Sequence, residues 1–328
     1  MNKSEIRILV TGGAGYIGSV LVRQLLSEGY SVRVLDILRS GGESLLELVN
    51  HPRFEFIRGD IRDKKAVETA VANCYGVAHL AAIVGDPASR KEPELTHATN
   101  LDGSCLLWDT ASRSGCQRFV FASTCSNYGK MPDSDAYVTE GSPLQPLSLY
   151  AETKVEFEKF LLGRSRQNGC KPVCLRFSTV YGLSPRVRFD LTVNEFTRDL
   201  TLGKELVIFG EQFWRPYCHV QDLGRSVMAV LAAGESKVAF ETFNVGDTTE
   251  NYTKAMVVAE IQRQIPNAKV KYVPKQEDAR DYRVDFSKIR DQLGFAITRR
   301  VSDGIREIRL VLQQGLLQNP YDARYSNT

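Results

Sequence analysis

The sequence predicts an α/β fold in which helices cover both faces of a doubly wound parallel sheet. Short apolar runs, rich in Val, Ile, Leu and Phe, alternate with longer stretches whose apolar residues recur at helical spacing. The first run leads directly into a glycine turn, TGGAGYIG at 11–18, and the second run ends in Asp36. Strands that alternate with helices form right-handed crossovers, which make the strands of one sheet parallel.

The glycine turn lies between a strand predicted at 6–10 and a helix predicted near 16–28. Such a turn brings unpaired backbone N–H groups and a helix N-terminus close to a diphosphate. A strand at 31–36 places Asp36 eighteen residues after Gly18, where a carboxylate can accept hydrogen bonds from both hydroxyls of an adenosine ribose. A tight turn with an unrelated surface Asp is the alternative. Together these features favour a dinucleotide site and a Rossmann-type sheet.

The next elements continue the alternation of strand and helix. Further strands are predicted at 54–57, 77–80, 119–123 and 173–177, and further helices near 63–72, 97–114 and 149–168. The last two of these helices carry apolar residues on more than one side, which indicates a second buried face. That face predicts a homodimer through helices 97–114 and 149–168, although packing within one chain explains it equally well.

The chain is less regular after the sixth strand. Segment 181–216 mixes Pro, Gly, Arg and aromatic residues, whereas a helix at 222–233 and a strand at 240–245 are expected to join the sheet. Segment 250–328 is predicted to be helical and rich in loops, and its polar end, 319–328, is predicted to be loosely held. The second domain is therefore expected to consist of two segments of the chain.

The composition excludes several classes of protein. The 328 residues include 42 Lys and Arg against 39 Asp and Glu, a net charge of +3, and no basic block points to nucleic acid. No apolar stretch approaches the ~20 residues that span a bilayer, and the N-terminus runs straight into a strand without a secretory signal. The seven cysteines follow neither a disulfide framework nor a metal-ligand spacing. A cytoplasmic protein without a metal site or a membrane partner is expected.

Tyr150 and Lys154 are the strongest candidates for catalytic chemistry. Their spacing of four puts both side chains on one face of the predicted helix. A nearby ammonium group stabilises a phenolate, so the pKa of Tyr150 is expected to fall from ~10 towards neutral pH. Such a tyrosine can accept the proton of an alcohol that is being oxidised. A Tyr and a Lys at this spacing also occur by chance on helix surfaces, but here they follow a strand that ends in Thr124, where α/β sheets bind ligands.

These residues form part of a wider set that resembles the extended short-chain dehydrogenase/reductases of the NAD-dependent nucleotide-sugar epimerase/dehydratase family. The resemblance reaches to about residue 310 and implies a catalytic triad of Thr124, Tyr150 and Lys154. The motifs that carry it are TGGAGYIG, Asp36, Gly59-Asp60-Ile61, His79-Leu80-Ala81-Ala82, Asn100 with Gly103, FAST at 121–124, Tyr128-Gly129, Tyr150 with Lys154, and RPYCHVQD at 215–222.

The resemblance implies that the chain binds NAD. Asp36 independently favours NAD over NADP, because a carboxylate repels a 2′-phosphate, while Arg39 and Ser40 nearby keep NADP as an alternative. The implied cofactor-binding residues are Gly12, Gly15, Tyr16, Ile17, Gly18, Asp36, Asp60, Ile61, Leu80, Ala81, Ala82, Asn100, Tyr150, Lys154 and Phe177.

The resemblance also implies a nucleotide-diphosphate sugar as the substrate. Arginine suits a diphosphate in both geometry and charge, although a solvated surface charge is the alternative for each arginine. The implied domains are an NAD-binding domain at 1–180 and about 217–245, and a smaller, discontinuous substrate domain at about 181–216 and 246–328. The implied substrate-binding residues are Thr124, Ser126, Arg186, Arg188, Asn194, Arg215 and Arg280.

The chain departs from the family pattern directly after Thr124. Related 4,6-dehydratases carry Asp-Glu at the next two positions, and decarboxylases carry a Glu at the second, whereas this chain has Cys125 and Ser126. Without a carboxylate there, removal of a C5 proton lacks its local base, which disfavours a dehydratase. Ser178 replaces the usual asparagine, and 184–191 resembles a branch that acts on nucleotide-activated heptoses and deoxysugars.

The favoured prediction is an NAD-dependent nucleotide-sugar epimerase that acts through a transient 4-keto intermediate, with Tyr150 as the acid/base. A C4 dehydrogenase or 4-keto reductase with net turnover of NAD(H) would use the same residues. A non-catalytic NAD(H)-binding protein is a third reading, because fold alone does not establish catalysis.

Overall fold

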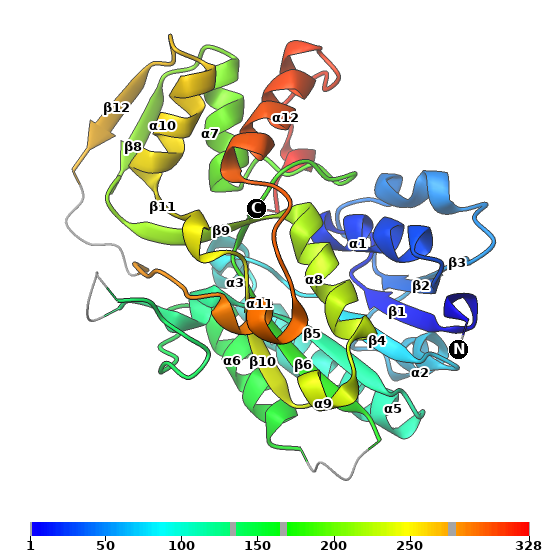
Figure 1. The fold of residues 1–328 in the computed structure, drawn as a ribbon. Helices are drawn as coiled ribbons and strands as arrows, with labels where there is room; N and C mark the ends of the chain where they lie inside the picture. Colours follow the sequence, from blue (N-terminus) through cyan, green and yellow to red (C-terminus); the bar gives the residue numbers. More distant parts are fainter. Residues whose placement is uncertain (1, 132–135, 165–168, 275–279, 328) are drawn as a thin grey trace.

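The computed structural model describes residues 2–131, 136–164, 169–274 and 280–327. Its centre is a seven-stranded parallel sheet with the strand order β10-β6-β5-β4-β1-β2-β3 (Figure 1). The order reverses between β1 and β4, as in a doubly wound sheet, so the predicted Rossmann-type fold is confirmed. The strands are β1 (Arg7–Thr11), β2 (Ser31–Asp36), β3 (Phe54–Arg58), β4 (Gly76–His79), β5 (Arg118–Thr124), β6 (Lys171–Phe177) and β10 (Glu241–Val245).

Each face of the sheet is covered by helices because alternate side chains of a strand point to opposite faces. On β1, Ile8 and Val10 join one apolar core, and Leu9 joins a second core with Trp108 and Phe157. Both cores are fully closed to solvent at these residues. The helices are α1 (Tyr16–Ser27) and α8 (Val220–Ala232) over the first core, and α2 (Lys64–Val71), α5 (Ser104–Arg113) and α6 (Leu149–Leu162) over the second.

Two predicted helices have different boundaries in the structure. Helix α6 begins after Ser148, whose hydroxyl accepts a hydrogen bond from the backbone N–H of Ala151 at 3.3 Å, and it ends at Leu162 rather than at 168. Residues 165–168 lie outside the described residues. The helix predicted at 97–114 consists of three successive parts. These are the end of α4 (Pro93–His97), a π-helical turn (Ala98–Gly103) and α5. No helix of the described residues has the length and apolar character needed to cross a membrane.

A second group of elements lies beyond the carboxyl ends of the sheet strands. Its apolar core contains Val193, Val257 and Ile305 from three different helices. The chain returns to the main sheet between its segments, since α8 and β10 follow β9. The division into two discontinuous domains stays a prediction. The elements are β7 (Thr179–Tyr181), α7 (Thr192–Thr201), β8 (Leu206–Phe209), β9 (Trp214–His219), β11 (Asn251–Thr253), α10 (Lys254–Gln264), β12 (Val270–Val273) and α12 (Val301–Gln313).

The polar segment that follows α12 packs against Phe189 and α12 through Tyr325. The Tyr325 ring packs edge-on against Phe189 with 5.7 Å between ring centroids, and the Phe189 N–H donates to the Tyr325 carbonyl at 2.7 Å. The structure thus gives this segment an anchor at Tyr325, and the prediction that 319–328 is loosely held stays a prediction. Tyr325 supplies an apolar contact that the polar composition of the segment does not predict. Other short helices of the fold are α3 (Asp86–Lys91), α9 (Glu235–Val238) and α11 (Ser287–Leu293).

Candidate active site

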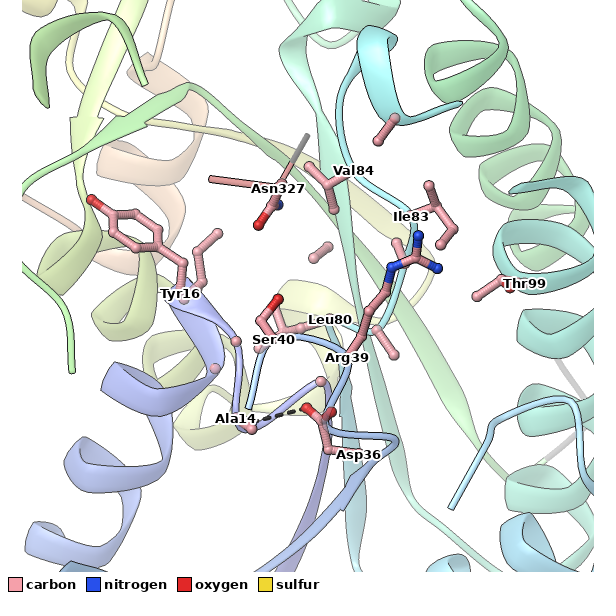
Figure 2. Close-up of a pocket in the computed structure, with 18 of the residues that line it drawn as sticks. Ala14, Tyr16, Asp36, Arg39, Ser40, Leu80, Ile83, Val84, Thr99 and Asn327 are labelled. Carbon is pink, nitrogen blue, oxygen red and sulfur yellow. Dashed lines mark hydrogen bonds between the residues drawn. The ribbon is translucent and has the colours of Figure 1, made fainter. Parts of the chain in front are cut away.

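A cavity of about 450 Å³ opens at the carboxyl ends of the central strands. Figure 2 shows its β2 end, where Asp36, Ala14 and Ser40 lie close together. Most residues predicted to bind the cofactor or to catalyse the reaction line this one cavity. These are Gly12, Gly15, Tyr16, Ile17, Gly18, Asp36, Asp60, Ile61, Leu80, Ala81, Ala82, Thr124, Tyr150, Lys154 and Phe177.

The glycines of the turn allow close backbone contacts that any side chain would prevent. A Cβ on Gly12, which has φ +74°, would lie 2.8 Å from the Ala81 nitrogen, and one on Gly18 would lie 2.1 Å from the Gly12 carbonyl oxygen. Gly15 is the N-cap of α1 and provides no side-chain cap. The first N–H groups of α1 are therefore open to an anion, so the turn fits the diphosphate of a dinucleotide.

Asp36 at the end of β2 supports the turn from the other side of the cavity. Its carboxylate accepts a hydrogen bond from the Ala14 N–H at 3.0 Å (Figure 2). It also accepts one from the Leu38 N–H at 2.8 Å. Burial nevertheless raises the pKa of Asp36 above its usual value. Each carboxylate oxygen has a further lone pair, which leaves acceptors for the hydroxyls of an adenosine ribose.

Three candidate catalytic side chains meet where β5 ends and α6 begins. The Thr124 hydroxyl hydrogen-bonds that of Tyr150, and its oxygen accepts the Ser126 N–H at 3.1 Å. The Lys154 ammonium nitrogen donates to the Ala122 carbonyl at 2.8 Å and lies 5.8 Å from the centre of the Tyr150 ring. This arrangement can hold a substrate hydroxyl between Thr124 and Tyr150.

The pKa of Tyr150 differs from the prediction in direction. Burial raises the pKa of Tyr150 to about 12, although its hydrogen bond with Thr124 and the charge of Arg188 oppose the rise. Burial also lowers the pKa of Lys154 to about 7, against the opposing charge of Glu158. The expected lowering of the tyrosine pKa by Lys154 is wrong for the protein alone, because the loss of hydration outweighs the opposing effects of Thr124 and Arg188.

A buried ion pair lies directly beneath the catalytic residues. Glu158, one helical turn after Lys154, is 1% exposed and accepts hydrogen bonds from the Arg176 guanidinium at 2.8–3.2 Å. Its carboxylate also accepts from the Ser123 hydroxyl and from the Asn127 amide. The ion pair thus ties α6 to the ends of β5 and β6, which holds the Thr124 backbone against Tyr150. The sequence interpretation missed this pair, since its two residues lie eighteen positions apart.

Arg186 and Arg188, predicted to bind the substrate, also line this cavity. Arg188 forms a two-point ion pair with Asp190, with distances of 2.9 and 2.6 Å. Arg186 donates to the Ser40 hydroxyl at 3.2 Å and to the Ser326 carbonyl at 3.0 Å.

Five other predicted residues do not line the cavity, and the structure gives them different surroundings. Asn100 is buried and bonds to both backbone groups of Ile83. Asn194 is buried as well, and its amide donates to the Tyr16 hydroxyl at 3.1 Å. Both amides therefore support residues of the cavity wall.

Ser126, Arg215 and Arg280 lie beside the cavity. The Ser126 side chain bonds to that of Tyr282, and the Arg215 guanidinium lies 5.5 Å from the centre of the same ring. Arg280 forms an ion pair of 3.2 Å with Asp86. The charge of Asp86 acts to raise the pKa of Tyr150, which places this carboxylate near the catalytic hydroxyl. The sequence interpretation did not single out Asp86, whose only signal is its place at the start of α3, shortly after β4.

Several further residues line the cavity without having been predicted to do so. They come from loops and from a distant part of the chain, where periodicity carries no information. They include Ile37, Arg39, Ser40, Arg62, Ile83, Thr99, Ser178, Val180, Ser326 and Asn327.

The profile of the NAD dependent epimerase/dehydratase family matches residues 8–246, which include all of the main sheet except its first residue, Arg7. The chain belongs to this family. Its members use NAD, and the glycine turn, Asp36 and the open N-terminus of α1 fit that cofactor in this epimerase/dehydratase.

Relatives of this epimerase/dehydratase carry different activities, which include dehydratases, epimerases and UDP-glucuronic acid decarboxylases. A dTDP-glucose 4,6-dehydratase of Streptomyces niveus is 33% identical over 92% of this chain and 91% of its own length. A UDP-glucose 4-epimerase of Lactobacillus helveticus is 29% identical over 88% of this chain and 92% of its own length.

Solved structures divide in the same way. A UDP-glucose 4-epimerase of Thermotoga maritima with UDP-glucose has a TM-score of 0.83 and 28% identity, covering 95% of this chain and 100% of its own. A dTDP-glucose 4,6-dehydratase of Streptomyces venezuelae with bound NAD has a TM-score of 0.83 and 29% identity, covering 94% and 98%. The comparisons thus support a nucleotide-sugar enzyme that uses NAD and leave its reaction open.

Proposed function

We propose that this protein is an NAD-dependent nucleotide-sugar 4-epimerase. The observation that supports this proposal is that Thr124, Tyr150 and Lys154 share one cavity with the glycine turn, while Cys125 and Ser126 follow Thr124. The shared cavity of the three residues and the glycine turn supports hydride transfer at a sugar carbinol. The presence of Cys125 and Ser126 removes the carboxylates that dehydration would require next to the ketone.

The catalytic residues have distinct roles in the proposed reaction. Tyr150 takes the proton of the C4 hydroxyl through its phenolic oxygen, and Thr124 orients that hydroxyl by hydrogen bonding. When bound, NAD supplies the redox chemistry by accepting the C4 hydride and giving it back. The 4-keto sugar turns about its diphosphate link before reduction, so the configuration at C4 is inverted. Lys154 would hold the nicotinamide ribose and stabilise the Tyr150 phenolate.

The proposed binding site for the sugar nucleotide lies beside the cavity, where β9 and the segment before α11 contribute Arg215 and Arg280. Arg215 and Arg280 supply two guanidinium groups, which can bind a diphosphate with paired hydrogen bonds. Arg280 is bound to Asp86 at 3.2 Å. A substrate diphosphate would therefore compete with Asp86 for Arg280 and free this carboxylate beside the sugar.

A 4,6-dehydratase is the second candidate because several relatives with about a third of their residues identical carry that name. In this chain the base for C5 would have to come from elsewhere in the site, and Asp86 is the carboxylate whose charge acts on Tyr150. The absence of acidic residues at 125 and 126 argues against this alternative.

One incubation separates these activities. Purified protein with added NAD is mixed with UDP-glucose or dTDP-glucose, and the products are analysed by mass spectrometry and proton NMR. We expect an isomer of unchanged mass with inverted configuration at C4. A product lighter by one water would identify a dehydratase, and unchanged C4 configuration across a panel of nucleotide sugars would contradict the proposal.

The absorbance of NADH in the same incubation tests the remaining alternatives. An epimerase shows no net change, whereas a C4 dehydrogenase accumulates NADH in proportion to product. A 4-keto reductase would consume NADH when given a 4-keto sugar nucleotide. A non-catalytic NAD(H)-binding protein would bind NADH and leave every sugar unchanged. We expect the epimerase to act in the cytoplasm, where nucleotide sugars are made.

A further inference from the structure

Arg186 is a buried cation that lacks an ionic partner in the part of the chain that the structure describes. Its side chain is 7% exposed and lines the cavity, yet none of the ion pairs among the described residues includes it. Its Nη1 atom is buried without a hydrogen-bond partner. A buried guanidinium with an unsatisfied donor is costly unless a ligand completes its bonding, and an anion would complete both its charge and its hydrogen bonds.

The position of Arg186 is set by two contacts with the first turn of α1 and the end of β2. The Ser184 hydroxyl, two residues earlier, donates to the Tyr16 carbonyl at 2.6 Å. The guanidinium itself donates to Ser40, which lies in the loop that follows Asp36. Arg186 therefore lies in the cavity wall between the first turn of α1 and the loop that follows Asp36, the residue predicted to bind the adenosine ribose.

The strand order separates this position from the sugar-binding side. Asp36 ends β2 and Thr124 ends β5, and the two strands are three places apart in the order β5-β4-β1-β2. At the usual spacing of neighbouring strands, their ends lie about 14 Å apart. A diphosphate held between the α1 N-terminus and Arg186 is thus the one that belongs to the dinucleotide.

We propose that Arg186 binds the diphosphate of the dinucleotide cofactor together with the N-terminus of α1, instead of the diphosphate of the sugar nucleotide. This assignment replaces the substrate-binding role predicted for Arg186, and it holds whichever sugar reaction the enzyme performs. Arg188, which lies beside it, differs because Asp190 already neutralises its charge at 2.6 Å. The proposal also implies that the cofactor is coupled to segment 319–327, since the Ser326 carbonyl accepts from the same guanidinium.

The test measures binding of NADH by fluorescence titration, without any sugar present. We expect R186Q to bind NADH and ADP about 10- to 100-fold more weakly than the unaltered protein, the range for loss of a charge-assisted hydrogen bond. Titrations with UDP and dTDP, which contain the diphosphate of the sugar nucleotide, should be unchanged. The matched control is R324Q, which removes the same charge from an exposed position in the same segment and should not change NADH binding.

Two results would overturn the proposal. Weaker binding of UDP or dTDP with unchanged NADH binding would return Arg186 to the sugar nucleotide. The variant Y325A removes the aromatic anchor of the segment and keeps Arg186. If Y325A weakens NADH binding as much as R186Q does, the loss of binding in R186Q comes from altered docking of the segment. Hydrogen exchange at 319–327 gives an independent readout: NADH should slow it in the unaltered protein and not in R186Q. Melting of each variant without ligand shows whether it is folded.

Discussion

At the residue scale, burial and neighbouring charges shift the pKa of Tyr150 in opposite directions, and the same holds for Lys154. The two side chains lie on one face of α6, as their spacing predicts. The structure buries Lys154 and half-buries Tyr150, and this loss of hydration raises the pKa of Tyr150 to about 12 and lowers that of Lys154 to about 7. The spacing therefore predicted the partnership, whereas the protonation states depend on the depth of the site, which spacing does not encode.

The role of the Tyr150 hydroxyl can be tested by Tyr150→Phe, which keeps the ring and removes the acid/base. We expect turnover of the nucleotide sugar to fall about 10²- to 10⁴-fold, the range for a general acid/base, with NADH binding retained. Tyr321→Phe, a matched change at a half-exposed tyrosine, should leave turnover unchanged. Initial rates and NADH titrations of both variants check this, and full activity in Tyr150→Phe would exclude the proposed mechanism.

The lowered pKa of Lys154 predicts how the stability of the cofactor-free protein depends on pH. In the unfolded chain a lysine has a pKa of about 10.4, whereas burial lowers the pKa of Lys154 to about 7 in the folded protein. Between these values the unfolded state binds more protons, so the contribution of Lys154 to stability rises with pH. From pH 7 to pH 9 the gain is roughly 2 kcal/mol.

Urea unfolding of the unaltered protein and of Lys154→Met at both pH values provides the measurement. The variant is the control, because it keeps every other titrating group, and the prediction concerns the difference between the two proteins. We expect the unaltered protein to gain stability relative to the variant as the pH rises. An equal response of both proteins would mean that Lys154 stays charged throughout.

At the element scale, the strand–turn–helix unit of β1 and α1 lines part of the cavity that is predicted to hold the cofactor. Its glycines are required by close contacts: Gly12 approaches the backbone that follows β4, and Gly18 packs on the backbone of Gly12 and Gly13. Asp36 then ties β2 to this turn through the Ala14 N–H. The short spacing of these residues made the unit predictable from the sequence.

Substituting alanine for Gly18 tests the packing of the turn. Its Cβ would meet the Gly12 carbonyl at 2.1 Å and the Gly13 Cα at 2.7 Å, so the turn must shift. We expect a loss of about 1–3 kcal/mol in the free energy of unfolding, as for other overpacked sites, and loss of most NADH binding. Gly234→Ala, where a Cβ meets nothing within 4 Å, is the control and should change neither quantity. Denaturant unfolding and NADH titration measure both effects.

At the scale of the whole molecule, segments from distant parts of the chain close around one cavity. The main sheet contributes Asp36 and Thr124, the segment before α7 contributes Arg186, and the end of the described chain contributes Ser326 and Asn327. If Arg186 binds the cofactor as proposed, this arrangement couples the cofactor to the packing of the segment that follows α12. The outer faces of α5 and α6, in contrast, retain partly exposed apolar residues such as Leu106 and Phe160.

These outer faces support the prediction that two copies of the chain associate through α5 and α6. Sedimentation at micromolar concentration should show a species of twice the 36.7 kDa chain mass. Leu106→Asp places a charge on a partly exposed apolar position and should shift this species to the monomer while leaving the melting temperature of the monomer intact. Leu316→Asp, at an exposed leucine far from these helices, is the control. A monomer in the unaltered protein would refute the dimer.

The sequence by itself determined the doubly wound sheet, the glycine turn with Asp36, and the association of Thr124 with Tyr150 and Lys154. Each of these depends on local periodicity or on short spacing, which one chain segment encodes completely. The tertiary structure alone decided the burial that sets the pKa values of Tyr150 and Lys154, the Glu158 and Arg176 pair beneath them, and the position of Arg186 beside Ser40 and Ser326. These features arise from contacts between residues far apart in the chain, and such contacts are created only by packing.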